Sequence, residues 1–158
     1  MNKRIDWTRL ITSVLLAESI GLIGTVFTTP NIEGWYQTLA KPVFSPPNWL
    51  FGPVWLGLYF LIGLAIYQLW SLSKTGKAIN TIRLFAFHLF LNAAWSPVFF
   101  GRQQIAIGLA ILLVMDLSLV VCLQRFKRLN LAAWWYLLPY LAWILFASLL
   151  NGSLLLLN

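Results

Sequence analysis

Five long apolar segments constrain the fold of this chain more than any other feature of its sequence. Each runs for about 20 residues almost free of charge, which is the length that a helix needs to cross the hydrocarbon core of a bilayer. They span residues 7–27, 49–72, 82–100, 105–123 and 131–150. Membrane strands would alternate apolar and polar residues, whereas these segments are uniformly apolar. The sequence therefore predicts an all-α, polytopic membrane protein: one domain over residues 1–158, built as a bundle of five transmembrane helices.

The composition excludes several other classes of protein. Of the 158 residues, 60% are hydrophobic and 9% are charged, whereas a soluble domain has about a quarter of its residues charged. The connections between segments leave no room for a separate soluble domain. The single Cys122 excludes an intrachain disulfide, and one histidine is too few for a zinc site. We expect no metal site and no obligatory cofactor.

The net charge of +7 reports on membrane topology. The charges lie between apolar segments and not on one face, which argues against a nucleic-acid partner. Nine basic residues fall on the side of the amino terminus: Lys3, Arg4, Arg9, Lys74, Lys77, Arg83, Arg125, Lys127 and Arg128. Lys41 and Arg102 fall on the other side. The positive-inside rule predicts a multi-pass cell-membrane protein with a cytoplasmic amino terminus, and with the long connection and the carboxyl terminus outside.

The connection over residues 28–47 is the only long one, and it combines helix-breaking and apolar residues. Five of its residues, Pro30, Gly34, Pro42, Pro46 and Pro47, interrupt regular structure. Trp35, Tyr36 and Leu39 are side chains that a fully solvated loop does not need. We therefore expect this connection to fold back onto the bundle as a lid.

The nine tryptophans divide by their expected depth in the membrane. Trp7, Trp70, Trp134 and Trp135 fall at segment ends, as in an interfacial aromatic belt. Three others, Trp55, Trp95 and Trp143, fall deeper, in the outer half of the bundle together with Asn92. This placement predicts an aromatic cavity beneath the lid, suited to a large, flat, mostly apolar ligand. The alternative is a belt with ordinary helix packing.

Ionisable residues inside the apolar segments are candidate functional groups, because burying them in lipid is costly. His88 and Asp116 fall at the same depth on consecutive, antiparallel segments. We expect a hydrogen bond between them that locks the two helices together; a proton relay is the alternative. Glu18 has no evident cationic partner, so it is either protonated or faces a wet cavity.

Residues 35–55 carry a specific pattern, W-Y-x-x-L-x-K-P-x-x-x-P-P-x-W-x-F-x-P-V-W. This pattern resembles the tryptophan-rich sensory protein family, also called the translocator protein or peripheral benzodiazepine receptor family. Residues 91–100 match a second block of that family, and residues 138–151 match a third.

The resemblance implies a five-helix membrane protein that binds tetrapyrroles such as protoporphyrin IX, hydrophobic drugs and sterols. By matched positions it implies a ligand site formed by Trp35, Tyr36, Trp55, Asn92, Trp143, Ala147 and Asn151, beside Trp95. In some bacterial members, the positions of Trp55 and Trp143 are linked to light-dependent breakdown of porphyrin, which makes these two residues the catalytic candidates. The expected function is a receptor with a regulatory or stress-sensing role. Light-dependent porphyrin degradation and porphyrin or sterol transport are the alternatives. Expected partners are membrane lipid and a second copy of the chain, as a homodimer.

One departure from the animal members concerns the end of the sequence. Those members carry a cholesterol-recognition pattern of Leu or Val, then Tyr, then a basic residue. Residues 151–158 contain no Tyr, Lys or Arg. The resemblance therefore favours a bacterial-type member.

Overall fold

The computed structural model describes residues 5–70, 72 and 75–158, and the chain within these ranges folds into helices without any strand. The helices are α1 (Trp7–Ile32), α2 (Trp35–Thr38), α3 (Asn48–Leu69), α4 (Gly76–Ser96) with the π-helical turn η1 (Pro97–Gly101), α5 (Ile105–Leu129) and α6 (Leu131–Leu157). Among the described residues, five helices are long and apolar enough to cross a membrane: α1, α3, α4 with η1, α5 and α6. The prediction of an all-α, five-helix membrane protein is confirmed.

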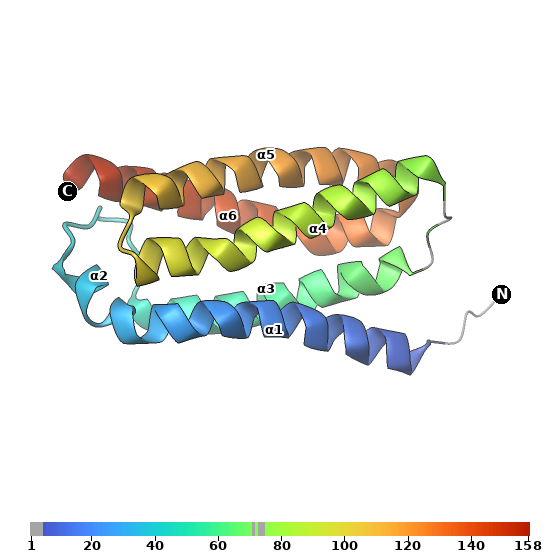
Figure 1. Ribbon diagram of the computed structural model, residues 1–158, viewed down its shortest axis with the longest axis horizontal. Coiled ribbons are helices and arrows are strands. Elements are labelled where there is room, and N and C mark those ends of the chain that lie inside the picture. The colour runs from blue at the N-terminus through green and yellow to red at the C-terminus, as the bar shows by residue number, and fades with distance from the viewer. Residues whose placement is uncertain (1–4, 71, 73–74) are drawn as a thin grey trace.

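The five long helices lie side by side along the long axis of the molecule (Figure 1). Helix α1 packs against α3 and α4, α3 packs against α6, and α5 packs against both α4 and α6, so the helices close into a ring. The amino terminus and the α5–α6 connection lie at one end of the ring. Helix α2 and the carboxyl terminus lie at the other end (Figure 1).

Several helices extend beyond the apolar segments that predicted them. Helix α1 continues through Pro30 to Ile32, so the expectation that Pro30 interrupts regular structure is wrong. Helix α4 begins at Gly76, where the Thr75 hydroxyl accepts a hydrogen bond from the Ala78 amide at 3.4 Å. Helix α5 continues to Leu129, and Asn130 then caps α6 by accepting from the Ala133 amide at 3.0 Å. Capping side chains satisfy the free amides of the first turn, so they fix where a helix begins. The uncharged segment of a sequence predicts the part of a helix that lies in lipid, and this part is shorter than the whole helix.

The third span ends in a wider turn because of Pro97. Its ring carries no amide hydrogen, so the regular helical hydrogen bond is missing there. The chain continues as the π-helical turn η1, in which the Arg102 amide donates to the Pro97 carbonyl at 2.9 Å. Gln103 then adopts a φ of 56°, which closes the tight connection into α5.

Two glycines let α1 and α3 approach closely. A Cβ atom on Gly63 would lie 2.6 Å from the Val14 Cα, and one on Gly21 would lie 2.5 Å from the Tyr59 ring. Small residues at helix crossings are a common means of packing helices in membranes. These contacts fix α1 against α3.

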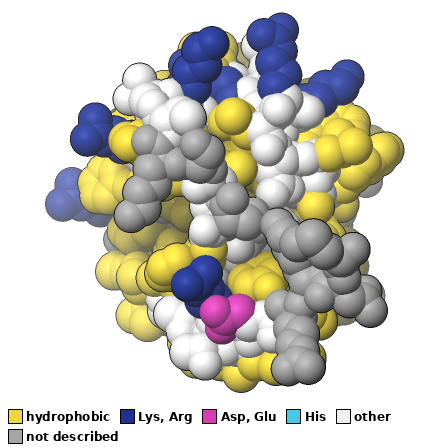
Figure 2. All heavy atoms as spheres, turned by 90° about the vertical axis from the view of Figure 1, so that its right-hand side faces the viewer, with side chains coloured by type: hydrophobic (Ala, Val, Ile, Leu, Met, Phe, Trp, Pro, Cys, Tyr) yellow, Lys and Arg dark blue, Asp and Glu magenta, His cyan; other side chains and the backbone are white. Residues whose placement is uncertain are grey.

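The end of the ring near the amino terminus is basic. Figure 2 shows Lys and Arg side chains gathered around this end; the helices that meet there carry Arg9, Lys77, Arg83, Arg125, Lys127 and Arg128. Lys3, Arg4 and Lys74, which were counted with them in the sequence, lie outside the described residues.

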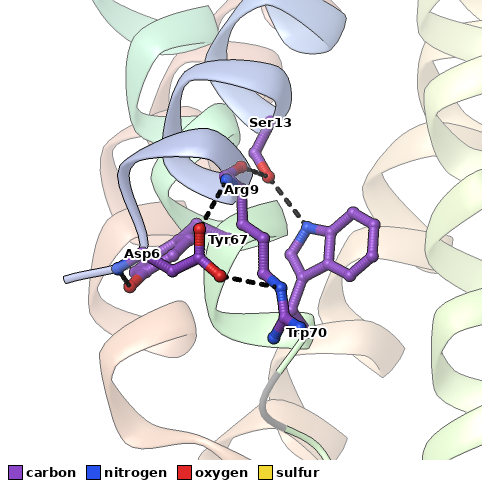
Figure 3. A network of polar contacts seen from close by, with 5 residues as sticks. All are labelled: Asp6, Arg9, Ser13, Tyr67 and Trp70. Carbon is purple, nitrogen blue, oxygen red and sulfur yellow. Dashed lines mark hydrogen bonds and ion pairs between the residues drawn. The ribbon is translucent and has the colours of Figure 1, made fainter. Parts of the chain in front are cut away.

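A polar network joins α1 to α3 at this basic end (Figure 3). The Asp6 carboxylate accepts from the Arg9 amide at 3.1 Å and pairs with the Arg9 guanidinium at 3.0 Å. The guanidinium also lies over the Trp70 ring, 5.6 Å from its centre, and the Trp70 indole donates to the Ser13 hydroxyl at 3.0 Å. Trp70 therefore anchors the end of α3 to the start of α1.

The opposite end is covered by the long connection, which folds onto the bundle as expected from its apolar side chains. Tyr36 is buried, and Phe44 packs edge-on against Phe146. The Asn158 amide bonds the Ala40 backbone in both directions, accepting at 2.9 Å and donating at 3.1 Å. The lid is thereby held against α6.

Candidate ligand-binding cavities

A small cavity of about 50 Å³, here called the lid cavity, lies directly beneath α2. Its walls come from every part of the bundle except α5. They are formed by Thr28, Tyr36, Phe51, Trp55, Trp95, Phe99, Phe100, Trp143, Ala147, Leu150, Asn151 and Leu154. The lining is mainly aromatic and aliphatic, with a few polar atoms.

A larger cavity of about 480 Å³, here called the α1 cavity, lies among α1, α3 and α4. It shares Thr28, Phe51, Trp55 and Trp95 with the lid cavity, so the two adjoin across these side chains. Its volume falls within the range of about 300–1,000 Å³ that is usual for small-molecule sites. Together they provide an aromatic space in the half of the bundle nearer the lid.

The structure brings together seven of the eight residues that the sequence predicts for a ligand site. Six of them, Tyr36, Trp55, Trp95, Trp143, Ala147 and Asn151, line the lid cavity. Asn92 lines the α1 cavity instead. That these side chains bind a ligand stays a prediction.

Trp35 is the predicted residue that lines neither cavity. Its ring packs edge-on against Phe99, with ring centres 5.4 Å apart, and against Phe100 at 6.5 Å. Trp35 thus supports the aromatic wall from behind, while its neighbour Tyr36 faces the cavity.

Sequence reasoning missed several lining residues. Leu150 and Leu154 follow Ala147 on α6 at helical spacing, and Tyr59 follows Trp55 one turn later on α3. The spacing of three or four residues was a usable signal for these three. Phe99 and Phe100 gave no such signal, because the π-helical turn changes the direction in which they point.

Polar atoms on the lid cavity remain available to a ligand. The Trp95 indole N–H and both amide atoms of Asn151 are buried without a hydrogen-bond partner among the described residues. Burial raises the pKa of Tyr36, and the neighbouring Ser45 hydroxyl partly offsets this rise, so the phenol stays protonated at neutral pH. Buried polar groups normally have partners. The lid cavity therefore offers donors and an acceptor to the polar edge of a ligand.

The predicted hydrogen bond between His88 and Asp116 is wrong. The His88 Nδ1 atom bonds the Ser118 hydroxyl at 2.9 Å and its Nε2 atom bonds the Tyr140 hydroxyl at 2.8 Å. Asp116 accepts from the Ser148 hydroxyl at 2.6 Å instead. Asp116 and Ser118 are two positions apart on α5, so they point to different sides of the helix. Depth alone did not reveal which side faces α4.

His88 belongs to a buried chain of hydrogen bonds that reaches the α1 cavity. The Tyr59 hydroxyl donates to the Asn92 carbonyl oxygen at 2.5 Å, and the Asn92 amide donates to the Tyr140 hydroxyl at 2.7 Å. Ser118 donates to the Met115 carbonyl at 3.0 Å, so it accepts from His88. The ring of His88 is fully buried and has no acidic partner among the described residues, so the imidazole is neutral. Its proton then lies on Nδ1, and Nε2 accepts from the Tyr140 hydroxyl. Every donor in this chain of hydrogen bonds therefore points in the direction from Tyr59 to the Met115 carbonyl.

These features define the class of protein: a multi-pass, all-helical membrane protein that encloses aromatic cavities beneath a lid. Comparison with known sequences identifies the family. The family model described as the TspO/MBR family matches residues 13–157. The chain belongs to this family.

Individual relatives cover nearly the whole chain. The tryptophan-rich protein TspO of Archaeoglobus fulgidus is 40% identical over 150 residues, covering 95% of this chain and 97% of its own. The protein of the same name from Chlorobaculum tepidum is 37% identical and covers 100% and 99% of the two chains. The human translocator protein is 36% identical, and the match covers 86% of this chain and 82% of the human protein. This chain is therefore similar to members from an archaeon, a bacterium and an animal.

Proposed function

We propose that this protein is a membrane receptor for tetrapyrroles such as protoporphyrin IX and for similar hydrophobic ligands, with a regulatory or stress-sensing role. The observation that carries the proposal is the aromatic wall shared by the two cavities. Trp55 and Trp95 contribute to both, and Trp143 adds a third indole to the lid cavity. Flat aromatic side chains offer a macrocycle large contact areas at low cost in conformational entropy.

The polar atoms of the lid cavity support the same proposal. A porphyrin carries an extended apolar ring with polar groups at one edge. The Trp95 indole and the Asn151 amide, which have no hydrogen-bond partner in the described part of the chain, suit such an edge, while the aromatic side chains suit the ring. Two relatives carry names that fit a sensory or translocator role: the tryptophan-rich sensory protein of Cereibacter sphaeroides and the bovine translocator protein.

The direct test is a titration of the purified protein in nanodiscs with protoporphyrin IX. We expect saturable quenching of tryptophan fluorescence at one ligand per chain, with empty nanodiscs as the control for partition into lipid. Quenching that rises without saturation, as in the empty nanodiscs, would contradict the proposal.

A second candidate function is light-dependent breakdown of the bound porphyrin. Trp55 stacks on Tyr59, with ring centres 5.4 Å apart and planes inclined at 27°. Two adjoining oxidisable rings beside the cavities are suited to donate electrons to an excited macrocycle. Illumination of the complex distinguishes the functions. Loss of the porphyrin absorption bands with a new product, abolished in Trp55→Phe or Trp143→Phe, supports an enzyme, whereas stable bands support a receptor.

We further propose that the basic end faces the cytoplasm of the cell and that the lid and carboxyl terminus lie outside. The described basic residues support this orientation, since six gather at the end of the amino terminus and Lys41 and Arg102 lie at the other. Cytoplasmic loops of membrane proteins carry the excess of Lys and Arg.

A further inference from the structure

The α1 cavity has an acidic lining that the resemblance and the proposed function leave unexplained. Two of its lining residues, Glu18 and Glu33, carry carboxyl groups. None of the described residues that line it is Lys, Arg or His. The cavity therefore offers carboxyl groups and no fixed positive charge to its occupant.

Glu18 is the more consequential of the two carboxyls because of its depth. It lies near the middle of α1, a helix long and apolar enough to span the membrane. Within the described part of the chain, Glu18 makes no hydrogen bond or ion pair. The ion pair found among the described residues joins Arg9 to Asp6 and does not involve Glu18. An acidic group at that depth is costly unless a partner or a wet cavity compensates it. A ligand in the α1 cavity is placed to supply that partner.

The two carboxyls also set the length of the site. Glu33 follows α1 directly and is exposed at the lid end. Fifteen residues separate it from Glu18, which corresponds to about 22 Å along a helix. Between them the wall is mainly apolar and aromatic and includes Trp55 and Trp95, and the side chains of threonine, serine and asparagine residues interrupt it. The space suits an elongated or flat apolar molecule whose inner end meets Glu18.

We propose that the α1 cavity selects its ligands by charge, taking flat apolar molecules with a cationic amine or another strong N–H donor that pairs with Glu18, and disfavouring molecules whose buried end is a carboxylate. The inference rests on the proposed role as a receptor for hydrophobic ligands and adds the charge preference. An anionic ligand must direct its carboxylates away from Glu18.

The test uses three pyrene probes with the same ring and different charges: 1-pyrenemethylamine, 1-pyrenemethanol and 1-pyrenecarboxylic acid. Binding to the full chain in phosphatidylcholine nanodiscs is followed by energy transfer from tryptophan to pyrene, with empty nanodiscs subtracted. A charge-assisted hydrogen bond to Glu18 should make the amine bind about tenfold more tightly than the alcohol. The acid should bind more weakly than the alcohol. Equal affinities for the amine and the acid would overturn the proposal.

Two matched variants locate the effect. Glu18→Gln should bring the affinity for the amine down to that for the alcohol and should improve binding of the acid. Asp116→Asn is the control, because Asp116 is also a carboxyl within a span but lines neither cavity. Equal effects of the two substitutions on amine binding would overturn the assignment to Glu18. If Glu18→Gln does not fold, the ranking of the three probes on the natural chain decides the question.

A protoporphyrin IX titration on the same nanodiscs keeps this inference separate from the proposed function. Porphyrin binding without a preference among the pyrene probes overturns the charge selection and leaves the receptor function standing. A preference for the amine that depends on Glu18, without porphyrin binding, supports the charge selection and contradicts a tetrapyrrole receptor.

Discussion

At the scale of the residue, the two most informative groups of side chains are the Tyr59–Asn92–Tyr140–His88 chain and the cavity tryptophans. The sequence correctly marked His88 as a residue needing a partner, because an imidazole inside a span is costly. It could not identify that partner, since Tyr140 lies 52 positions away on α6. Tyrosine is also an ordinary residue in an apolar segment, so its hydroxyl gave no signal.

Tyr140→Phe should destabilise the protein by removing the hydroxyl that joins Asn92 to His88. Each neighbour would lose a buried partner, and leaving a buried polar group unpaired costs about 1–3 kcal/mol. Thermal unfolding in detergent measures the loss. Tyr136→Phe is the control, since Tyr136 lies one turn earlier on α6 and its hydroxyl makes no hydrogen bond among the described residues. If both variants unfold at the same temperature, the chain of hydrogen bonds through Tyr140 does not stabilise the fold.

Trp143→Ala should weaken protoporphyrin IX binding several-fold or more. The indole lines the lid cavity, and stacking on one aromatic ring is worth about 1 kcal/mol beyond its buried area. Trp135→Ala on the same helix should leave the affinity unchanged, because Trp135 is exposed and lines neither cavity. Fluorescence titration of both variants compares them. Equal losses at the two positions would refute the cavity as the binding site.

At the scale of the element, the sequence predicted where each long helix lies but not how the helices meet. Uncharged length alone located all five spans, because lipid tolerates few charges. The close contact between α1 and α3 escaped prediction, since Gly21 and Gly63 face each other's helix through a pairing that no single segment reveals. The π-helical turn at Pro97 escaped it too, because a proline disturbs a helix without specifying the form of the turn that follows.

Gly63→Val should disrupt the packing of α1 against α3. Any Cβ at this position meets the Val14 backbone at 2.6 Å, and overpacking costs about 1–3 kcal/mol when backbone must move. Gly57→Val on the same helix is the matched control, because a Cβ there meets nothing within 4 Å. The comparison of their unfolding temperatures in detergent isolates the clash from the change in helix propensity. A Gly63 variant as stable as the Gly57 variant would contradict the close approach.

At the scale of the whole molecule, most of the described basic residues lie at one end and the lid cavity lies at the other. Six described basic residues surround the end of the amino terminus, while the lid cavity lies at the other end beneath α2. The charge pattern could be predicted from the sequence, because it needs only a count of the Lys and Arg residues between successive apolar segments. The cavities were foreseen as a single space, whereas their division in two depends on how Phe51, Trp55 and Trp95 fill the middle.

The proposed orientation predicts which engineered cysteines react from outside the cell. Arg102→Cys in the exposed turn at the lid end should react with a membrane-impermeant maleimide on intact cells, whereas Lys77→Cys at the basic end should react only after lysis. The natural chain is a suitable background, because its single Cys122 is buried. Labelling of Lys77→Cys on intact cells would reverse the orientation.

The common direction of the buried hydrogen bonds bears on whether protons can cross the membrane through the bundle. The chain that starts at Tyr59, on the wall of the α1 cavity, ends where Ser118 donates to the Met115 carbonyl. A main-chain carbonyl has no proton to pass on, so within the described residues this row of polar groups has no exit toward the basic end. A polar cavity can therefore reach into the middle of the bundle without providing a leak for protons.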